Sequence, residues 1–157
     1  MSDCGPEIVK AARTRIGVPF RHHFKPYNLC EGGIVTVDAC MERGMDGESY
    51  DCSGLVIASL CDVLGILPEQ WPRDYRHVNQ LEELAETKRP DVGDVLLFFP
   101  EPVANKPRRT HIGIFATEQS TIHASGISNY VEEGQVEGVF REIKVVPSFV
   151  LAGLEPN

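Results

Sequence analysis

The chain has 157 residues, of which 42% are hydrophobic and 24% are charged. This is the size and composition of one ordinary domain, and a chain of this length buries roughly 70% of its unfolded surface without disulfides or metals. No apolar run approaches the roughly 20 residues of a membrane helix. The net charge of −8, from 23 acidic and 15 basic residues, disfavours nucleic acid and anionic membranes as partners. We therefore expect residues 1–157 to form a single domain that is an enzyme or a small-ligand binder. We take this domain to be a monomer, although the sequence does not determine the oligomeric state.

The N-terminus and the cysteines leave the compartment open. Residues 1–6 have no basic start followed by an apolar stretch, so we expect no signal peptide. The protein would then act in the cytoplasm, or outside the cell by another route or after trimming. The cysteines are Cys4, Cys30, Cys40, Cys52 and Cys61. Their spacings match no zinc-finger pattern, so we expect reduced thiols and no metal or other cofactor.

Three segments show the periodicity of amphipathic helices. We expect helices over residues 7–16, 52–64 and 75–86. The second has the strongest signal, because its apolar residues cover more than one stripe, Asp51 suits its N-cap and Gly65 suits its end. Residues 20–50 are irregular and rich in glycine, with one β-like run over residues 34–37. A loop this long is uncommon in a compact domain and is often functional.

After Pro90 the pattern changes to that of strands. Apolar runs and period-two alternation predict strands over residues 95–99, 111–116, 120–125, 139–146 and 149–151. A hairpin over residues 118–119 would join the second strand to the third. Because the helices come first and the strands follow, we expect an α+β fold in which N-terminal helices pack on an antiparallel sheet.

One cysteine and two histidines carry the chemistry. Cys52 opens the strongest predicted helix, where backbone N–H groups and the helix dipole favour a thiolate. His111 begins a predicted strand, and an imidazole held there beside Cys52 would supply the base that a cysteine nucleophile needs. His123 lies on the next strand, so across a tight hairpin it would sit beside His111 and orient its ring.

Each of these residues also has a purely structural interpretation. A cysteine on a buried helix is usually a small apolar residue, as we expect for Cys61. A single histidine on a strand is usually a satisfied core or surface residue. One cysteine and two histidines without further context would be a weak signal of catalysis.

That context comes from motifs that occur in a fixed order along the chain. They are IGVPFR (residues 16–21), DCSGL (51–55), VGDVLLFF (92–99), THIGIF (110–115) and IHAS (122–125). Together they resemble the NlpC-type cell-wall peptidases, a family of papain-like cysteine peptidases, over about residues 7–150. The resemblance implies that Cys52 is the nucleophile, His111 the base and His123 the third, orienting residue of a Cys-His-His triad.

The resemblance also implies a substrate. Members of the family typically hydrolyse the bond between D-γ-glutamate and the following diamino acid in peptidoglycan stem peptides. Asp51 and Ser53, which flank the nucleophile, would help to hold the free amino end of the L-Ala-D-Glu part, although Asp51 also suits a plain N-cap. The backbone N–H of Cys52 would donate to the oxyanion that forms during attack.

Two features depart from the family pattern. The family usually carries a tyrosine shortly before the cysteine that aids the oxyanion, but Phe20 has no hydroxyl. His22, Tyr27 or Tyr50 could substitute, and we place His22 first because it adjoins the matched segment. The second departure is an insertion over about residues 24–49. Its role stays open between a lid that restricts the cleft to short stem peptides and a surface excursion.

Other interpretations compete with a stem-peptide hydrolase. Cys30 and Cys40 are packing residues, a disulfide or part of a metal clip, and the basic strip over residues 106–109 is a solvated loop or a grip for a substrate carboxylate. The chain could be a related papain-like amidase or acyltransferase acting on another amide, as a phage lysis or tail enzyme or a delivered toxin. It could also be a non-catalytic or metal-binding module. The intact set of Cys52, His111 and His123 disfavours the non-catalytic alternative, and the products of digestion would separate the two enzymes.

Overall fold

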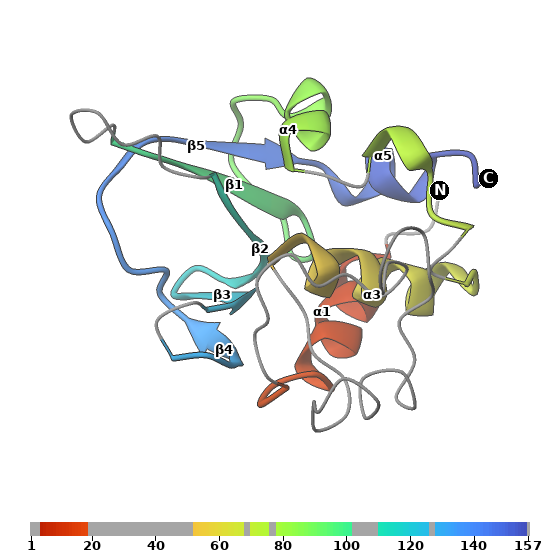
Figure 1. The fold of residues 1–157 in the computed structure, drawn as a ribbon, viewed down its shortest axis with the longest axis horizontal. Coiled ribbons are helices and arrows are strands. Elements are labelled where there is room, and N and C mark those ends of the chain that lie inside the picture. Colours follow the sequence, from red (N-terminus) through yellow and green to blue (C-terminus); the bar gives the residue numbers. More distant parts are fainter. Residues whose placement is uncertain are drawn as a thin grey trace.

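The structure is a computed structural model that describes residues 4–18, 52–67, 70–75, 78–101, 110–125 and 128–156, apart from the side chains at 52, 53, 73, 78 and 79. Two helices, α1 (Gly5–Arg13) and α3 (Cys52–Leu64), pack against each other and on an antiparallel sheet (Figure 1). This arrangement confirms the predicted α+β fold. The predicted insertion over residues 24–49 and the basic strip over 106–109 lie outside the described residues.

The sheet has five strands in the order β4-β3-β2-β1-β5, and every neighbouring pair is antiparallel. The strands are β1 (Val95–Pro100), β2 (His111–Thr117), β3 (Ser120–Ala124), β4 (Val131–Gly134) and β5 (Phe140–Val146). Four of them match predicted strands to within one residue at each end. Residues 118–119 turn between β2 and β3, which confirms the predicted hairpin.

The main core lies between the two helices and the sheet. Residues 54–61 of α3 are all buried, as the prediction of a helix apolar on several sides requires. Along the strands, alternate side chains point toward the helices, as the pleat dictates. These side chains are Val95, Leu97 and Phe99 on β1, Ile112, Ile114 and Ala116 on β2, and Ile122 and Ala124 on β3. Each large one contributes about 1.5–3 kcal/mol by leaving water.

Asp94 ties the start of β1 to its surroundings. Its buried carboxylate accepts hydrogen bonds from the backbone N–H of Ser148 and of Asp91, both at 2.8 Å. Its backbone C=O accepts from the N–H of Phe115 on β2 at 2.8 Å. Both carboxylate oxygens are therefore satisfied, as a buried charge requires. The aspartate of the VGDVLLFF motif thus has a structural role in this fold.

The structure corrects two predicted elements. The helix expected over residues 75–86 is instead two short pieces, α4 (Val78–Leu81) and the 3₁₀ turn η3 (Glu82–Leu84), because Glu86 leaves the helix to exchange both backbone hydrogen bonds with Val145. The last strand, expected over residues 149–151, is instead the helix α5 (Ser148–Ala152). Its start is held by the Ser148–Asp94 hydrogen bond and not by a neighbouring strand.

The structure also shifts one boundary and adds one strand. The first helix ends at Arg13 rather than residue 16, because residues 17 and 18 pair with Val131: the N–H of Gly17 donates to the Val131 C=O, and the Val131 N–H donates to the Val18 C=O, both at 2.8 Å. This pairing anchors β4, a strand that the sequence patterns did not predict.

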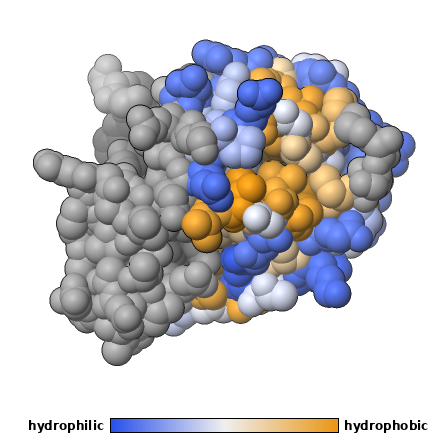
Figure 2. Space-filling model, turned by 90° about the vertical axis from the view of Figure 1, so that its right-hand side faces the viewer, coloured by the Kyte–Doolittle hydropathy of each residue, from blue (hydrophilic) through white to orange (hydrophobic). Residues whose placement is uncertain are grey.

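The end of the molecule that carries α5 and the C-terminus shows apolar side chains at its surface (Figure 2). Of the described residues, Leu67 after α3 and Phe149 in α5 are each more than half exposed. Within the described ranges, no helix has the length and apolar character needed to cross a membrane.

Gly93, at the entry to β1, should tolerate no side chain. Its φ of 88° is unfavourable for other residues, and a Cβ there would collide with the backbone of Gly5 at the start of α1. We expect Gly93→Ala to lower the free energy of unfolding by at least about 2 kcal/mol, measured by urea denaturation. Gly134→Ala is the control, because a Cβ at Gly134 meets nothing within 4 Å. Equal stability of the two variants would contradict this account of the contact between α1 and β1.

Candidate active site

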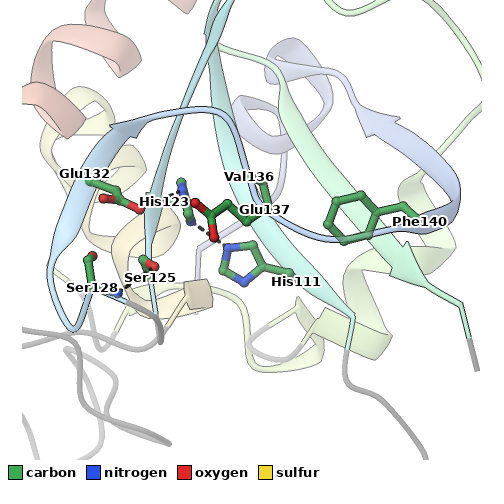
Figure 3. Close-up of a pocket in the computed structure, with 8 residues that line it drawn as sticks. All are labelled: His111, His123, Ser125, Ser128, Glu132, Val136, Glu137 and Phe140. Carbon is green, nitrogen blue, oxygen red and sulfur yellow. Dashed lines mark hydrogen bonds and ion pairs between the residues drawn. The ribbon is translucent and has the colours of Figure 1, made fainter. Parts of the chain in front are cut away.

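Two histidines meet on neighbouring strands. His111 is the first residue of β2, and His123 lies on β3. The Nε2 atom of His111 and the Nδ1 atom of His123 are 2.8 Å apart, a hydrogen-bond distance, and the two rings stand edge to face at 88° (Figure 3). The hairpin therefore brings together the two histidines that the sequence analysis paired.

The strand register explains this meeting. Ile114 pairs with Ile122, so one step further along the ladder Gly113 lies opposite His123 and the two histidines are diagonal neighbours on one face. A Cβ at Gly113 would lie only 3.2 Å from the Cβ of His123. The glycine of the THIGIF motif thus permits β3 to approach β2 at the level of the dyad.

The dyad lies on the face of the sheet that points away from the core between helices and sheet. Alternation puts Ile112 and Ile122 into that core and the histidines on the other face. The connection from β4 to β5 crosses this face, and Figure 3 shows Val136 and Glu137 from it beside the rings. The histidines line a cavity of about 240 Å³ with Ser125, Ser128, Glu132, Val136, Glu137 and Phe140.

Burial sets the charge of both rings. Loss of solvent, and to a lesser degree the neighbouring His123, lowers the pKa of His111 to about 4. Burial also lowers the pKa of His123, while the nearby carboxylate of Glu132 acts in the opposite direction. Both rings are therefore neutral at pH 7. A neutral imidazole is the form that accepts a proton, so His111 has the charge state of a general base.

The free nitrogen of His111 is Nδ1. Its Nε2 is occupied by His123, and no hydrogen bond from the described residues reaches Nδ1. If Nε2 carries the hydrogen and donates it to His123, then Nδ1 has an open lone pair on the side of the ring away from His123. That lone pair can take a proton from a thiol or give it to a leaving amine.

The structure describes the other predicted site residues only in part. Cys52 is the first residue of α3, as predicted, and α3 packs against β2 and β3, the strands that carry the histidines. Its side chain and that of Ser53 lie outside the described residues, as do Asp51 and His22. Cys61 is buried in the core, as expected for a packing residue.

Sequence analysis did not identify several residues that line the pocket. Glu132 lies on β4 directly opposite His123, with its Oε1 atom 3.5 Å from His123 Nε2. The segment over residues 131–134 is too short and too polar to show strand periodicity, so Glu132 gave no signal. Ser125 is the last residue of the IHAS motif, but nothing in the sequence indicates that it lines a cavity.

The low pKa of His111 predicts an acid-sensitive fold. An exposed histidine in the unfolded chain titrates near 6.5, so below this pH the unfolded state binds more protons, and stability falls as the pH drops toward 4. From pH 7 to pH 5 the loss due to His111 should be about 2 kcal/mol. Urea denaturation at both pH values should show that His111→Gln reduces the loss by about this amount. An equal loss in both proteins would show that the ring is not buried in its neutral form.

A family model described as the NlpC/P60 family matches residues 42–146, about two thirds of the chain. Among curated proteins, none matches the sequence. The chain spans 39% and 48% of the length of two NlpC structures from Trichomonas vaginalis.

Three solved structures show the same fold at low sequence identity. The peptidoglycan hydrolase RipB from Mycobacterium tuberculosis is 20% identical, with a TM-score of 0.57 over 91% of this chain and 63% of that one. An N-acetylmuramoyl-L-alanine amidase from Bacteroides uniformis is 12% identical, with a TM-score of 0.59 over 90% and 97%. RipD from M. tuberculosis, described as a non-catalytic NlpC/p60 domain protein adapted to peptidoglycan binding, is 14% identical, with a TM-score of 0.61 over 94% and 99%.

These structural likenesses establish a common fold, and the family model adds the sequence pattern. The chain belongs to the NlpC/P60 family, whose members are in general cysteine peptidases that act on peptidoglycan.

Proposed function

We propose that this chain is a cysteine peptidase that hydrolyses peptidoglycan stem peptides at the bond between D-γ-glutamate and the following diamino acid. Cys52 is the nucleophile, His111 the base and His123 the residue that orients it. The observation that carries the proposal is the 2.8 Å contact between His111 Nε2 and His123 Nδ1. It occupies one ring nitrogen of His111 and leaves the other for proton transfer, as a base with an orienting partner requires.

The reaction then follows in two halves. His111 Nδ1 takes the proton of the Cys52 thiol as Sγ attacks the amide carbon, and the C–N bond breaks while the imidazolium returns that proton to the leaving amine. Water then attacks the thioester, giving one proton to His111, and the C–S bond breaks. The carboxylic acid that forms leaves and loses its own proton to the solvent, and the proton on His111 returns to the Cys52 thiolate.

The start of α3 supports the charges that develop in these steps. In the first turn of a helix the backbone N–H groups lack intrahelical acceptors, so the Cys52 N–H can donate to the oxyanion. The positive end of the helix dipole favours the thiolate. We assign Asp51 and Ser53 to the free amino end of the substrate on the family resemblance alone. We assign His22 to the oxyanion, ahead of Tyr27 and Tyr50, because of its place beside the matched segment.

The presence of Cys52, His111 and His123 distinguishes this proposal from a binding protein. One fold neighbour is described as non-catalytic, so the fold alone does not make an enzyme. A chain that only bound peptidoglycan would need neither a cysteine at a helix N-terminus nor a histidine pair with one nitrogen open. The hydrogen-bonded pair therefore favours catalysis.

Variants of the three residues should show graded losses of hydrolysis. Cys52→Ala removes the nucleophile and should abolish turnover. His111→Ala should be nearly as damaging, because both proton transfers are lost. His123→Ala should retain roughly ten- to a hundredfold more activity than His111→Ala, and His123→Gln should recover part of the loss, since an orienting residue sets the geometry but does not react. Initial rates on a purified tetrapeptide, with circular dichroism of each variant, test this order.

Wild-type turnover by Cys52→Ala would refute the nucleophile. Complete loss in all three His123 and His111 variants, with each fold intact, would indicate that His123 has a direct role rather than an orienting one.

The bond that is cut separates the proposal from the nearest alternative. One fold neighbour is an N-acetylmuramoyl-L-alanine amidase, which makes the bond between glycan and peptide the second candidate. Mass spectrometry of a digested muropeptide should detect a disaccharide that retains L-Ala-D-Glu and a free peptide that begins with the diamino acid. Release of the whole peptide from the sugar would establish the amidase instead.

A further inference from the structure

The proton arrangement of the histidine pair has two forms, and only one of them is productive. If His111 Nε2–H donates to His123 Nδ1, the lone pair of His111 Nδ1 is open. If His123 Nδ1–H donates to His111 Nε2, then neutral His111 carries its hydrogen on Nδ1 and has no lone pair there for a thiol proton. The 2.8 Å contact is compatible with both forms. A group beyond His123 must therefore select between them.

Glu132 is positioned to be that group. His123 is only 3% exposed, and its Nε2 atom is buried with no hydrogen-bond partner among the described residues. The Oε1 atom of Glu132, which belongs to a carboxylate, lies 3.5 Å from this nitrogen. The β3–β4 register places the two residues directly opposite each other, and Figure 3 shows Glu132 on the side of His123 away from His111.

We infer that Glu132 is a positioning residue that selects the productive tautomer of the pair. An ionised carboxylate only accepts hydrogen bonds, so it favours a hydrogen on His123 Nε2. That tautomer leaves His123 Nδ1 as an acceptor, which in turn draws the hydrogen of His111 onto Nε2. The inference rests on the proposed function, and it extends the triad to a chain in the order Cys52, His111, His123, Glu132.

Glu132 also offsets the cost of charging the buried pair. When the thiol proton reaches His111, a positive charge forms where water is largely excluded. The carboxylate at the far end of the chain stabilises that charge. Because the Glu132 side chain is 43% exposed, solvent screens it and the effect should be moderate. Apart from the two histidines and Glu132, the titratable residue that lines the same cavity is Glu137 on the β4–β5 connection. Among the described residues, Glu137 forms no ion pair with either ring.

Glutamine and alanine at position 132 both remove the carboxylate. In Glu132→Gln the side-chain amide can donate to His123 Nε2 as well as accept from it, so the preference for one tautomer should be lost. Glu132→Ala leaves no hydrogen-bonding side chain at this position. Glu133→Gln is the matched control: Glu133 is the next residue along β4, but it binds Arg13 and Ser120 instead of a histidine. Thermal unfolding of each variant shows that it is folded.

The first readout is the ¹⁵N NMR spectrum of the histidine rings in the free protein at pH 7, which distinguishes protonated from unprotonated ring nitrogens. Wild type and Glu133→Gln should show His123 protonated at Nε2 and His111 with Nδ1 unprotonated. Glu132→Gln and Glu132→Ala should show a mixture of tautomers. A wild-type His123 protonated at Nδ1, or an unchanged spectrum in Glu132→Ala, would overturn the inference.

The second readout is the pH dependence of kcat/KM on the stem peptide. Loss of the carboxylate disfavours the imidazolium, so the acid limb of the profile, which reports protonation of the His111 base, should move to lower pH in Glu132→Gln and Glu132→Ala. At pH 7 the rate should fall by about fivefold, because the charge that His111 acquires in the transition state is less stabilised. Glu133→Gln should follow the wild type. A wild-type profile in both Glu132 variants would contradict the role of the charge. The NMR readout needs no turnover, so a wild-type chain without peptidase activity would refute the proposed function and still leave the tautomer test decisive.

Discussion

The register between β2 and β3 is the constraint on which the candidate site depends. Ile114 pairs with Ile122, and this single alignment sends Ile112 and Ile122 into the core and His111 and His123 to the opposite face. A slip by one residue would exchange these sets, burying a histidine among apolar side chains and exposing an isoleucine. The hydrophobic core therefore holds the two imidazole rings at hydrogen-bond distance. Gly113 contributes by leaving room for β3 at the level of the rings.

Burial keeps the two histidines neutral, and it also raises the free energy needed to protonate them. The connection between β4 and β5 covers the rings, and the loss of solvent keeps them neutral at pH 7. A neutral ring can accept a proton, but a buried ring is a poor host for the charge that results. Strand β4 brings a carboxylate to the far side of His123, so the same fold that excludes water also supplies a countercharge. The site combines a dry environment for proton transfer with fixed charge at its edge.

The sequence was most informative where periodicity and function coincide. Helix α3 and strands β1, β2, β3 and β5 have long apolar patterns, and their bounds were predicted closely. The short turn predicted that the two histidines would be close, but not that they would share a face. The turn alone would place Ile114 opposite His123, and the register shift between Phe115 and Thr117 instead places Gly113 there, so that both histidines lie on one face. Prediction failed where tertiary contacts decide the local structure. Glu86 leaves a helical segment to pair with Val145, and α5 forms because Ser148 bonds Asp94 and not a neighbouring strand.

The residues of the site that were missed share one property. Glu132 belongs to a four-residue strand that exists because Val131 pairs with residues 17 and 18 and because β3 offers a free edge. No local pattern in the sequence encodes either condition. Cys52, by contrast, was identified from its place at the start of a strongly periodic helix, and α3 begins at that residue.

The central claim is that His111 acts on Cys52, and the rate of alkylation of Cys52 by iodoacetamide tests it most directly. Peptide mass spectrometry assigns the product, since the chain has five cysteines. At pH 7 Cys52 in the folded chain should react at least roughly tenfold faster than the same residue in the urea-unfolded chain, and His111→Ala should remove most of that difference. A folded Cys52 that reacts no faster than the unfolded one, or one whose rate is unchanged by His111→Ala, would contradict the account.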